Sequence, residues 1–196
     1  MLDAWQYLIN HPEKLAGWTL EHLWIVFVAI VIAVILGVAL GLYITGRGKE
    51  HIADTVLRGA RRALAIPSMA IFGLLMLLLG SIGLKTFGFL PAVIALIIYG
   101  QLPILRNTYT AVRGVDPAMI EAGRGMGMTE KQLLFKVKLP LAVPVIMAGL
   151  RNAIVIIIGI AAIAAMIGAG GLGVPIFRGL RNARMDLIII GGVSVS

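Results

Sequence analysis

The chain has 196 residues, of which 60% are hydrophobic and only 13% are charged, and its mean hydropathy is +1.00. Soluble domains are about 45–50% apolar and about 25% charged, so this composition excludes an ordinary soluble protein and indicates an integral membrane protein. The net charge of +8 is concentrated in two loops between apolar runs, a pattern that is typical of cytoplasmic loops and argues against nucleic-acid binding.

Three long apolar runs occupy the first half of the chain. Leu23–Ile44 contains 22 uncharged residues, which at about 1.5 Å per residue cover a hydrocarbon core of roughly 30 Å. Ala63–Leu84 and Thr86–Leu105 are the second and third runs. Because only Lys85 separates them, we expect these two spans to form a tight helical hairpin.

Two further apolar runs follow. The fourth extends from about Val143 to Ile167 and is interrupted by Arg151, and the fifth begins near Leu187 and stops at Ser196. Ten residues of helix span only about 15 Å. The last segment is therefore either re-entrant or part of a helix whose natural C-terminus lies beyond Ser196, and we favour the second interpretation because helices rarely end within a bilayer.

Charge sets the expected orientation of these spans. The segment before the first run is acidic and lacks the features of a cleavable signal, so we expect the N-terminus to lie outside. Two basic clusters should then be cytoplasmic: Arg47, Lys49, Arg58, Arg61 and Arg62, and Arg106, Arg113, Arg124, Lys131, Lys136 and Lys138. The three arginines of the last loop, at positions 178, 181 and 184, oppose this topology. The sequence predicts an all-α membrane protein with about five transmembrane helices in one domain, residues 1–196.

The second basic loop, about residues 112–140, has its own helix signals. Asp116 can cap a short helix from Pro117 to about Arg124, and the glycines at 125 and 127 offer the left-handed backbone that ends it. Thr129 and Gln132 have the spacing of a capping box that opens a second helix, from Glu130 to about Lys138. We expect the prolines at 140 and 144 to separate this helix from the next span.

The same loop carries a motif with fixed spacing. Glu121-Ala-Gly is followed by three residues, Gly127, nine residues and Val137-Lys-Leu-Pro140. This arrangement closely resembles the coupling loop of importers driven by an ATP-binding cassette, whose pattern is Glu-Ala-Ala, three residues, Gly, nine residues and Ile-x-Leu-Pro. Only Gly123 and Val137 depart from that pattern.

The resemblance implies a permease subunit with the architecture of a type I importer, in the inner or plasma membrane of a prokaryote. Its short helix would dock in a groove of a separate ATP-binding subunit, through the residues Glu121, Ala122, Gly123, Met126, Gly127 and Met128. An ordinary amphipathic hairpin on lipid headgroups, with Met119, Leu133, Leu134 and Phe135 in contact with lipid, is the alternative from local chemistry alone.

The resemblance also implies partners. A second permease copy or a homologous permease, and an external substrate-binding protein, would complete the complex. No residue of this chain would be catalytic and it would hold no cofactor or metal, because the phosphate-binding motif G-x-x-x-x-G-K-[ST] is absent from the sequence and ATP with its Mg²⁺ would bind the partner subunit.

Segments on either side of this motif indicate which class of importer permease the chain resembles. The segments that begin at Leu102, Val115, Gly125 and Ile167 are similar to permeases for glycine betaine, carnitine, choline and related quaternary amines. A permease for another small solute, such as methionine, is the nearest alternative. A self-sufficient secondary transporter is the alternative from another class, but it predicts acidic residues within the spans, which the first four span cores lack.

Three residues are candidates for the substrate path or for the core. Arg151 lies well inside an apolar run. Its side chain either extends to the cytoplasmic interface or faces the bundle interior, where it binds a carboxylate or holds neighbouring backbone in place. Tyr99 and Tyr109 could offer aromatic faces to a trimethylammonium group, although aromatic residues in spans more often pack in the core.

Overall fold

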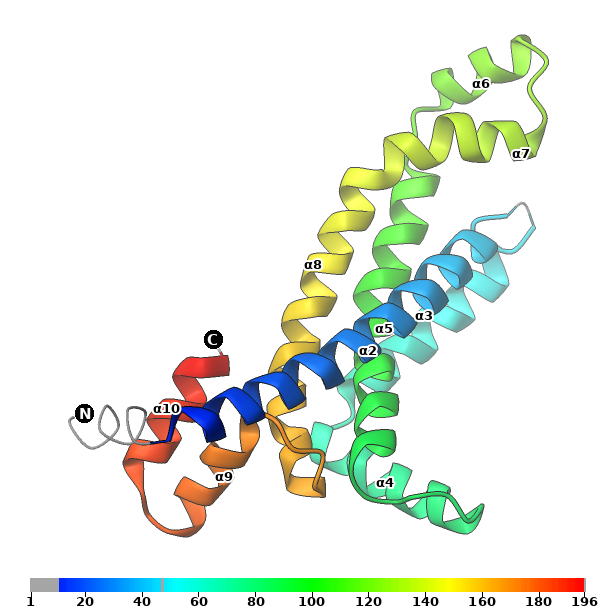
Figure 1. Cartoon of the computed structure of the whole chain (residues 1–196). Helices are drawn as coiled ribbons and strands as arrows, with labels where there is room; N and C mark the ends of the chain where they lie inside the picture. The colour runs from blue at the N-terminus through cyan, green and yellow to red at the C-terminus, as the bar shows by residue number, and fades with distance from the viewer. Residues whose placement is uncertain (1–10, 47, 196) are drawn as a thin grey trace.

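The computed structural model describes residues 11–46 and 48–195, and within these ranges it contains helices, turns and connecting segments but no strand (Figure 1). The elements in chain order are α2 (Pro12–Ile44), α3 (Glu50–Ala65), α4 (Ser68–Ser81), α5 (Phe89–Arg113), α6 (Pro117–Gly125), α7 (Glu130–Leu133), the π-helical turn η1 (Leu134–Lys138), α8 (Leu139–Ile163), the 3₁₀ turn η2 (Ala164–Ile167), α9 (Gly173–Arg181) and α10 (Met185–Val195).

The all-α membrane fold is confirmed, but the number of spans differs from the expected five. Three helices of the described ranges are long and apolar enough to cross a membrane: α2, α5 and the continuous helix from Glu130 to Ile167. A fourth span exists only if α3 and α4, which are bent by 105° at their junction, count as one. The last apolar helix, α10, has 11 residues.

The second expected span, Ala63–Leu84, is wrong as a single helix. Pro67 forces the preceding residue, Ile66, into an extended conformation with ψ of 131°, and α3 therefore ends at Ala65. Tyr99 of α5 donates a part-buried hydrogen bond from its hydroxyl group to the carbonyl oxygen of Ile66. The backbone carbonyl group at the break therefore has a hydrogen-bond donor. The tight hairpin of two full spans expected around Lys85 is instead a turn between the short helix α4 and α5.

The three long helices pack closely through small residues. In α2, Gly37 and Gly41 lie against α5: a Cβ atom added at Gly37 would be 2.6 Å from Ile104 Cγ2, and one added at Gly41 would be 2.7 Å from Thr108 Cβ. In α8, a Cβ at Gly149 would be 2.5 Å from Asn107 Cβ. Side chains at these glycines would separate the helices, so glycine sets the spacing of the bundle.

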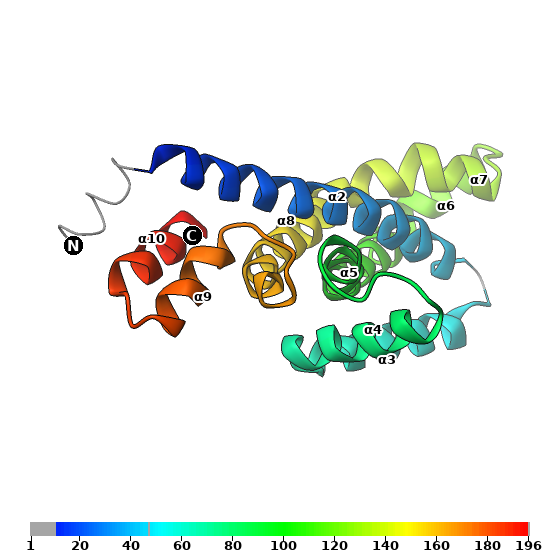
Figure 2. The same cartoon turned by 60° about the horizontal axis from the view of Figure 1, so that its bottom comes forward.

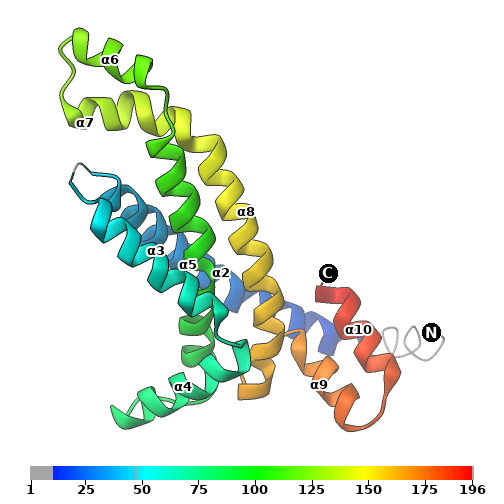
Figure 3. The ribbon, with the colours of Figure 1, turned by 180° about the vertical axis from the view of Figure 1, so that it is seen from behind.

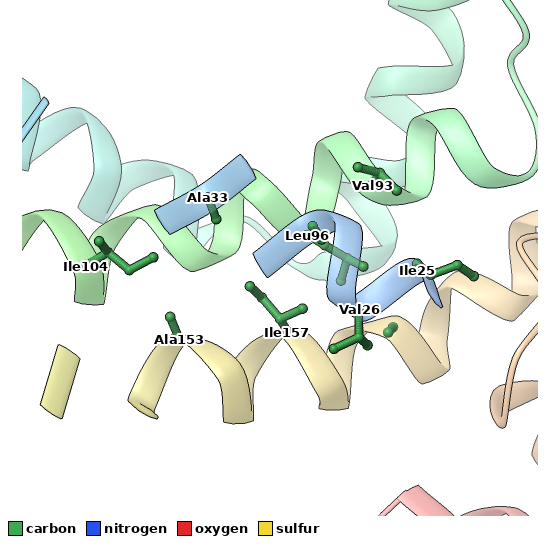
Figure 4. Close-up of a cluster of buried hydrophobic side chains, with 10 residues drawn as sticks. Ile25, Val26, Ala33, Val93, Leu96, Ile104, Ala153 and Ile157 are labelled. Atoms are coloured by element: carbon green, nitrogen blue, oxygen red, sulfur yellow. The ribbon is translucent and has the colours of Figure 1, made fainter. Parts of the chain in front are cut away.

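The bundle has three layers. Viewed along the α5–α8 pair, α2 crosses one face and α4 with α3 lies on the other (Figure 2). One buried cluster joins α2 to α5 and α8, with Ala33, Leu96 and Ile157 at its centre (Figure 4). A second cluster joins α4 to the opposite face, where Phe72 packs near Tyr99 and Ile167.

The two ends of the α5–α8 pair carry different structures. At one end lie α6 and α7; toward the other lie α4, α9 and α10 (Figure 3). The chain leaves η2 through a glycine-rich turn in which Gly168, Gly170 and Gly171 have positive φ values of 77–83°. Glu21 of α2 accepts a hydrogen bond from the Gly171 backbone N–H group at 2.9 Å, which ties the start of α2 to this turn.

Candidate functional site

The candidate site is the helical hairpin formed by α6 and α7, which we call the α6–α7 hairpin (residues 116–133). It lies beyond the ends of α5 and α8, away from α4, α9 and α10 (Figure 1). The hairpin connects two long helices of the bundle directly: Gly114 and Val115 lead into it from α5, and η1 leads out of it into α8. A force applied to the hairpin therefore acts on both helices.

The first arm begins and ends where the sequence predicts. The Asp116 carboxylate accepts a hydrogen bond from the Ala118 N–H group at 2.9 Å, and Pro117 occupies the first turn. The arm ends at Gly125, and Gly127 follows in the left-handed region with φ of 76°. Gly125 itself remains helical, so only Gly127 supplies the predicted left-handed residue.

The second arm starts with the predicted capping box. Thr129 Oγ1 accepts a hydrogen bond from the Gln132 N–H group at 3.3 Å, and Gln132 Oε1 accepts one from the Thr129 N–H group at 2.8 Å. These two hydrogen bonds satisfy two backbone donors that the first turn of a helix leaves free. The direction of the second arm is thus fixed by local chemistry.

The interior of the hairpin was not predicted. Leu133 is fully buried, and a Cβ atom at Gly123 would be 2.5 Å from its Cδ2 atom. The Met128 backbone N–H group also donates to the Gly123 carbonyl oxygen at 3.1 Å. Arg124 and Glu130, one on each arm, form an ion pair at 3.2 Å. The opposite charges on either side of the glycine turn were the only sequence signal of this closure.

The predicted end of the second arm is wrong. Pro140 and Pro144 do not separate it from the next span, because α7, η1 and α8 form one continuous helix. The wider π-helical turn η1 lets the helix continue up to Pro140. In this turn Leu139 donates its N–H group to the carbonyl oxygen of Leu134, five residues earlier in the chain. Such π-helical turns absorb irregular hydrogen bonding inside long helices, and Pro140 then falls in the first turn of α8.

The structure divides the six predicted docking residues into two groups. Glu121, Ala122, Met126 and Gly127 are exposed, and Met126 retains 70% of its accessible surface. Gly123 and Met128 face the interior of the hairpin, where they pack with Leu133. The small size of Gly123 serves a contact within the chain that was not predicted, and its contact with a partner stays a prediction.

The alternative set of lipid-facing residues is also divided. Met119 and Phe135 are exposed, as that alternative requires. Leu133 is fully buried and Leu134 is half-buried against Val112 and Ala142, so neither of them is available to lipid headgroups.

The three candidates for the path or the core are now placed. Tyr99 is a core residue that is 3% exposed, and its hydroxyl group donates a hydrogen bond to the Ile66 carbonyl oxygen. Tyr109 is half-buried, with the Arg113 guanidinium carbon 5.8 Å from its ring centroid. Arg113 also pairs with Glu50, so a protein cation already occupies this aromatic face. Arg151 is exposed on α8.

Comparison with known proteins places this arrangement in a family. The family model for the inner membrane component of binding-protein-dependent transport systems matches residues 33–196. The chain belongs to this family. Curated relatives of this inner membrane component include the osmoprotectant import permease protein OsmW of Salmonella typhimurium, which is 43% identical over 99% of this chain and 89% of its own length.

Two further relatives have similar identity. The carnitine transport permease protein OpuCD of Listeria monocytogenes is 40% identical, and the choline transport system permease protein OpuBB of Bacillus subtilis is 41% identical. Each alignment covers 97% of this inner membrane component and 84% of the relative.

Solved structures share the fold. A chain of the MetNI methionine ABC transporter, described as inward facing, matches with a TM-score of 0.81 at 23% identity, over 95% of this chain and 89% of that chain. An amino acid ABC transporter crystallised with histidines matches with a TM-score of 0.80 at 22% identity, over 97% and 89%. The fold of this inner membrane component is thus that of importer permeases.

Proposed function

We propose that the chain is the membrane-spanning subunit of an ATP-driven importer for small quaternary amines, and that the α6–α7 hairpin docks on a separate ATP-binding subunit. The observation that carries this proposal is the exposed surface of Glu121, Ala122 and Met126 on a capped, internally packed hairpin. The hairpin is rigid enough to transmit motion because both helix starts are capped and its centre is filled by Leu133.

The exposed surface has the composition of a protein contact. Met126 offers a flexible apolar side chain, and Glu121 offers a carboxylate that can form a charge-assisted hydrogen bond with a cation of the partner. The small side chain of Ala122 lets a partner approach the helix backbone closely. ATP would bind the partner subunit, and its hydrolysis would reach this chain as movement of α5 and α8.

The complete importer would contain two permease chains, two ATP-binding subunits and an external substrate-binding protein. In this assembly the hairpin lies in the cytoplasm and the start of α2 lies outside. Movement of the hairpins would switch the spans between inward-facing and outward-facing states, so that the delivered solute crosses by alternating access.

The substrate class follows the curated relatives. Those with 40–43% identity over nearly the whole chain are named for osmoprotectants, carnitine or choline. The methionine transporter shares the fold at only 23% identity, which does not favour methionine over quaternary amines. The secondary-transporter alternative requires intramembrane acids, and no Asp or Glu occurs in residues 55–115 or 131–185.

Copurification tests the docking surface. Glu121→Lys should abolish retention of the ATP-binding subunit while the permease still enters the membrane, since a lysine would repel the partner cation. Glu13→Lys is the matched control, because it reverses a carboxylate at the other end of the molecule that is also exposed. Retention of the ATP-binding subunit by Glu121→Lys would contradict the docking role of this residue.

A second measurement tests the energy source. Liposomes that contain this chain alone should take up no quaternary amine, whereas the assembled complex should take it up only with ATP inside and the substrate-binding protein outside. Uptake by the chain alone would refute the importer and favour a self-sufficient transporter.

A further inference from the structure

A groove with three polar residues in a mainly apolar lining lies on the face of the α5–α8 pair that α2 does not cover. Three of its lining residues are polar, namely Arg106 and Asn107 of α5 and Asn152 of α8. The remaining lining residues are apolar and come from α3, α5 and α8, including Leu64 at the end of α3. The volume is about 440 Å³, within the range of about 300–1,000 Å³ that is usual for small-molecule sites.

The groove opens at the surface of this chain, where Arg106 and Asn152 are exposed, but it lies away from the ends of the long helices. Arg106 precedes the end of α5 at Arg113 by about 10 Å at helical rise. Ala142 of α8 packs against Val112 near the end of α5, and Asn152 lies ten residues further along α8, about 15 Å at helical rise. At this depth lipid would make an exposed arginine and an exposed asparagine costly. Polar residues in spans therefore face a bundle interior or a water-filled path, which indicates that this face of α5 and α8 lines the solute path.

The cation of the groove has no partner within the described residues. Arg106 takes part in no ion pair there. The acidic groups that could compete for it are engaged elsewhere: Glu50 pairs with Arg113, and Asp54 pairs with Arg58. No acidic residue lines the groove. A positive charge in a span without a counter-charge leaves a site for an anionic group.

The two amides differ in what they offer. Asn107 donates from Nδ2 to the Pro103 carbonyl oxygen at 2.8 Å, so part of its hydrogen-bonding capacity is used within α5. The Asn152 side chain has no hydrogen-bond partner in the described ranges. Arg106 and Asn152 line the same groove from two different helices, and each side chain has donors that a carboxylate oxygen can accept.

We propose that Arg106 and Asn152 form a carboxylate-binding subsite in the solute path, which selects zwitterionic trimethylammonium solutes over those that carry only the cation. The subsite rests on the proposed import of quaternary amines. Arg106 binds the carboxylate and Asn152 donates a further hydrogen bond to it. The trimethylammonium end lies against the apolar wall, away from the arginine, which repels a solute that has no carboxylate.

The test compares two solutes in the complete importer, reconstituted in liposomes with its ATP-binding subunits and substrate-binding protein. Glycine betaine has a carboxylate, whereas choline has a hydroxyl group in its place. Arg106→Gln should lower ATP-driven uptake of glycine betaine at least about tenfold and leave choline uptake unchanged or raised. Arg106→Lys should retain part of the glycine betaine uptake, because it keeps the charge but loses the planar, two-pronged donor.

A second variant tests the other wall independently. Asn152→Asp should place a fixed carboxylate opposite Arg106, and should shift the uptake ratio toward choline. Arg61→Gln is the control: Arg61 is exposed on α3 and does not line the groove, so the ratio should not move. Assembly of each variant is checked by copurification of the ATP-binding subunit and by basal ATPase activity.

The outcomes separate the subsite from the importer itself. If Arg106→Gln lowers the uptake of both solutes equally while the complex stays assembled, the subsite is overturned. The arginine would then bind a lipid phosphate or a carboxylate of another subunit. An unchanged ratio in both variants would also overturn it. Loss of selectivity with ATP-driven uptake intact leaves the importer standing, whereas a wild-type complex that moves neither solute overturns the proposed import and the subsite together.

Discussion

Gly123 and Leu133 lie face to face at the centre of the α6–α7 hairpin, where a Cβ atom at position 123 would be 2.5 Å from Leu133 Cδ2. The contact joins two arms that have separate caps, at Asp116 and at Thr129. Together with the Arg124–Glu130 ion pair, this contact holds the exposed surface of the first arm in position relative to the second arm. If the hairpin docks on an ATP-binding subunit as proposed, we expect packing at this pair to matter for coupling as well as the exposed residues.

Gly123→Val tests this pair. Overpacking of a filled site costs about 1–3 kcal/mol, and each 1.4 kcal/mol corresponds to roughly tenfold in the population of the native arrangement. We expect substrate-stimulated ATPase activity of the assembled complex to fall about tenfold or more. Gly125→Ala is the control, because a Cβ atom there meets no atom within 4 Å and alanine favours a helix. Equal activity of the two variants would show that the hairpin interior does not matter.

Asp116→Ala tests the cap of the first arm. Loss of an N-cap carboxylate costs about 1 kcal/mol of helix stability, so backbone amides of α6 should exchange with deuterium roughly fivefold faster in hydrogen-exchange measurements. Glu121→Gln should leave this exchange unchanged while it weakens binding of the ATP-binding subunit, because Glu121 is exposed and makes no hydrogen bond in the described ranges. Faster exchange in Glu121→Gln instead would mean that this carboxylate stabilises α6.

Local signals explain why the hairpin could be predicted from the sequence. Asp116, Thr129 and Gln132 act on backbone groups two or three residues away, so their effects are visible in a short stretch of sequence. The contact of Gly123 with Leu133 was not predicted, because Leu133 reaches Gly123 only after the chain has turned at Gly127.

Longer-range contacts explain the other errors. Pro67 was visible in the sequence, but the 105° bend that follows it is stabilised by Tyr99, which lies 33 residues from the bonded carbonyl group of Ile66. The groove that Arg106 shares with Asn152 was not predicted, because it forms only when α5 packs against α8. Sequence patterns give the composition of each helix, while the partner helix determines which residues meet.

Gly41→Val tests the close contact of α2 with α5. A Cβ atom at this position would be 2.7 Å from Thr108 Cβ and 2.8 Å from Thr108 Cγ2, and Thr108 is fully buried. We expect the melting temperature of the detergent-solubilised complex to fall by several degrees, in line with a cost of about 1–3 kcal/mol. Gly159→Ala in α8 provides the comparison, since a Cβ atom there meets no atom within 4 Å and stability should be retained.

Tyr99→Phe separates a structural role of this tyrosine from a role in solute binding. Phenylalanine keeps the aromatic face that a trimethylammonium group would contact, but it loses the hydrogen bond to the Ile66 carbonyl oxygen. Loss of one such bond costs about 1 kcal/mol, and slightly more when the carbonyl oxygen is left without a partner. We therefore expect a lower melting temperature and faster hydrogen exchange at the α3–α4 junction, with an unchanged Michaelis constant for uptake. A raised Michaelis constant at unchanged stability would instead assign the Tyr99 hydroxyl group to the solute path, and would contradict its assignment to the core.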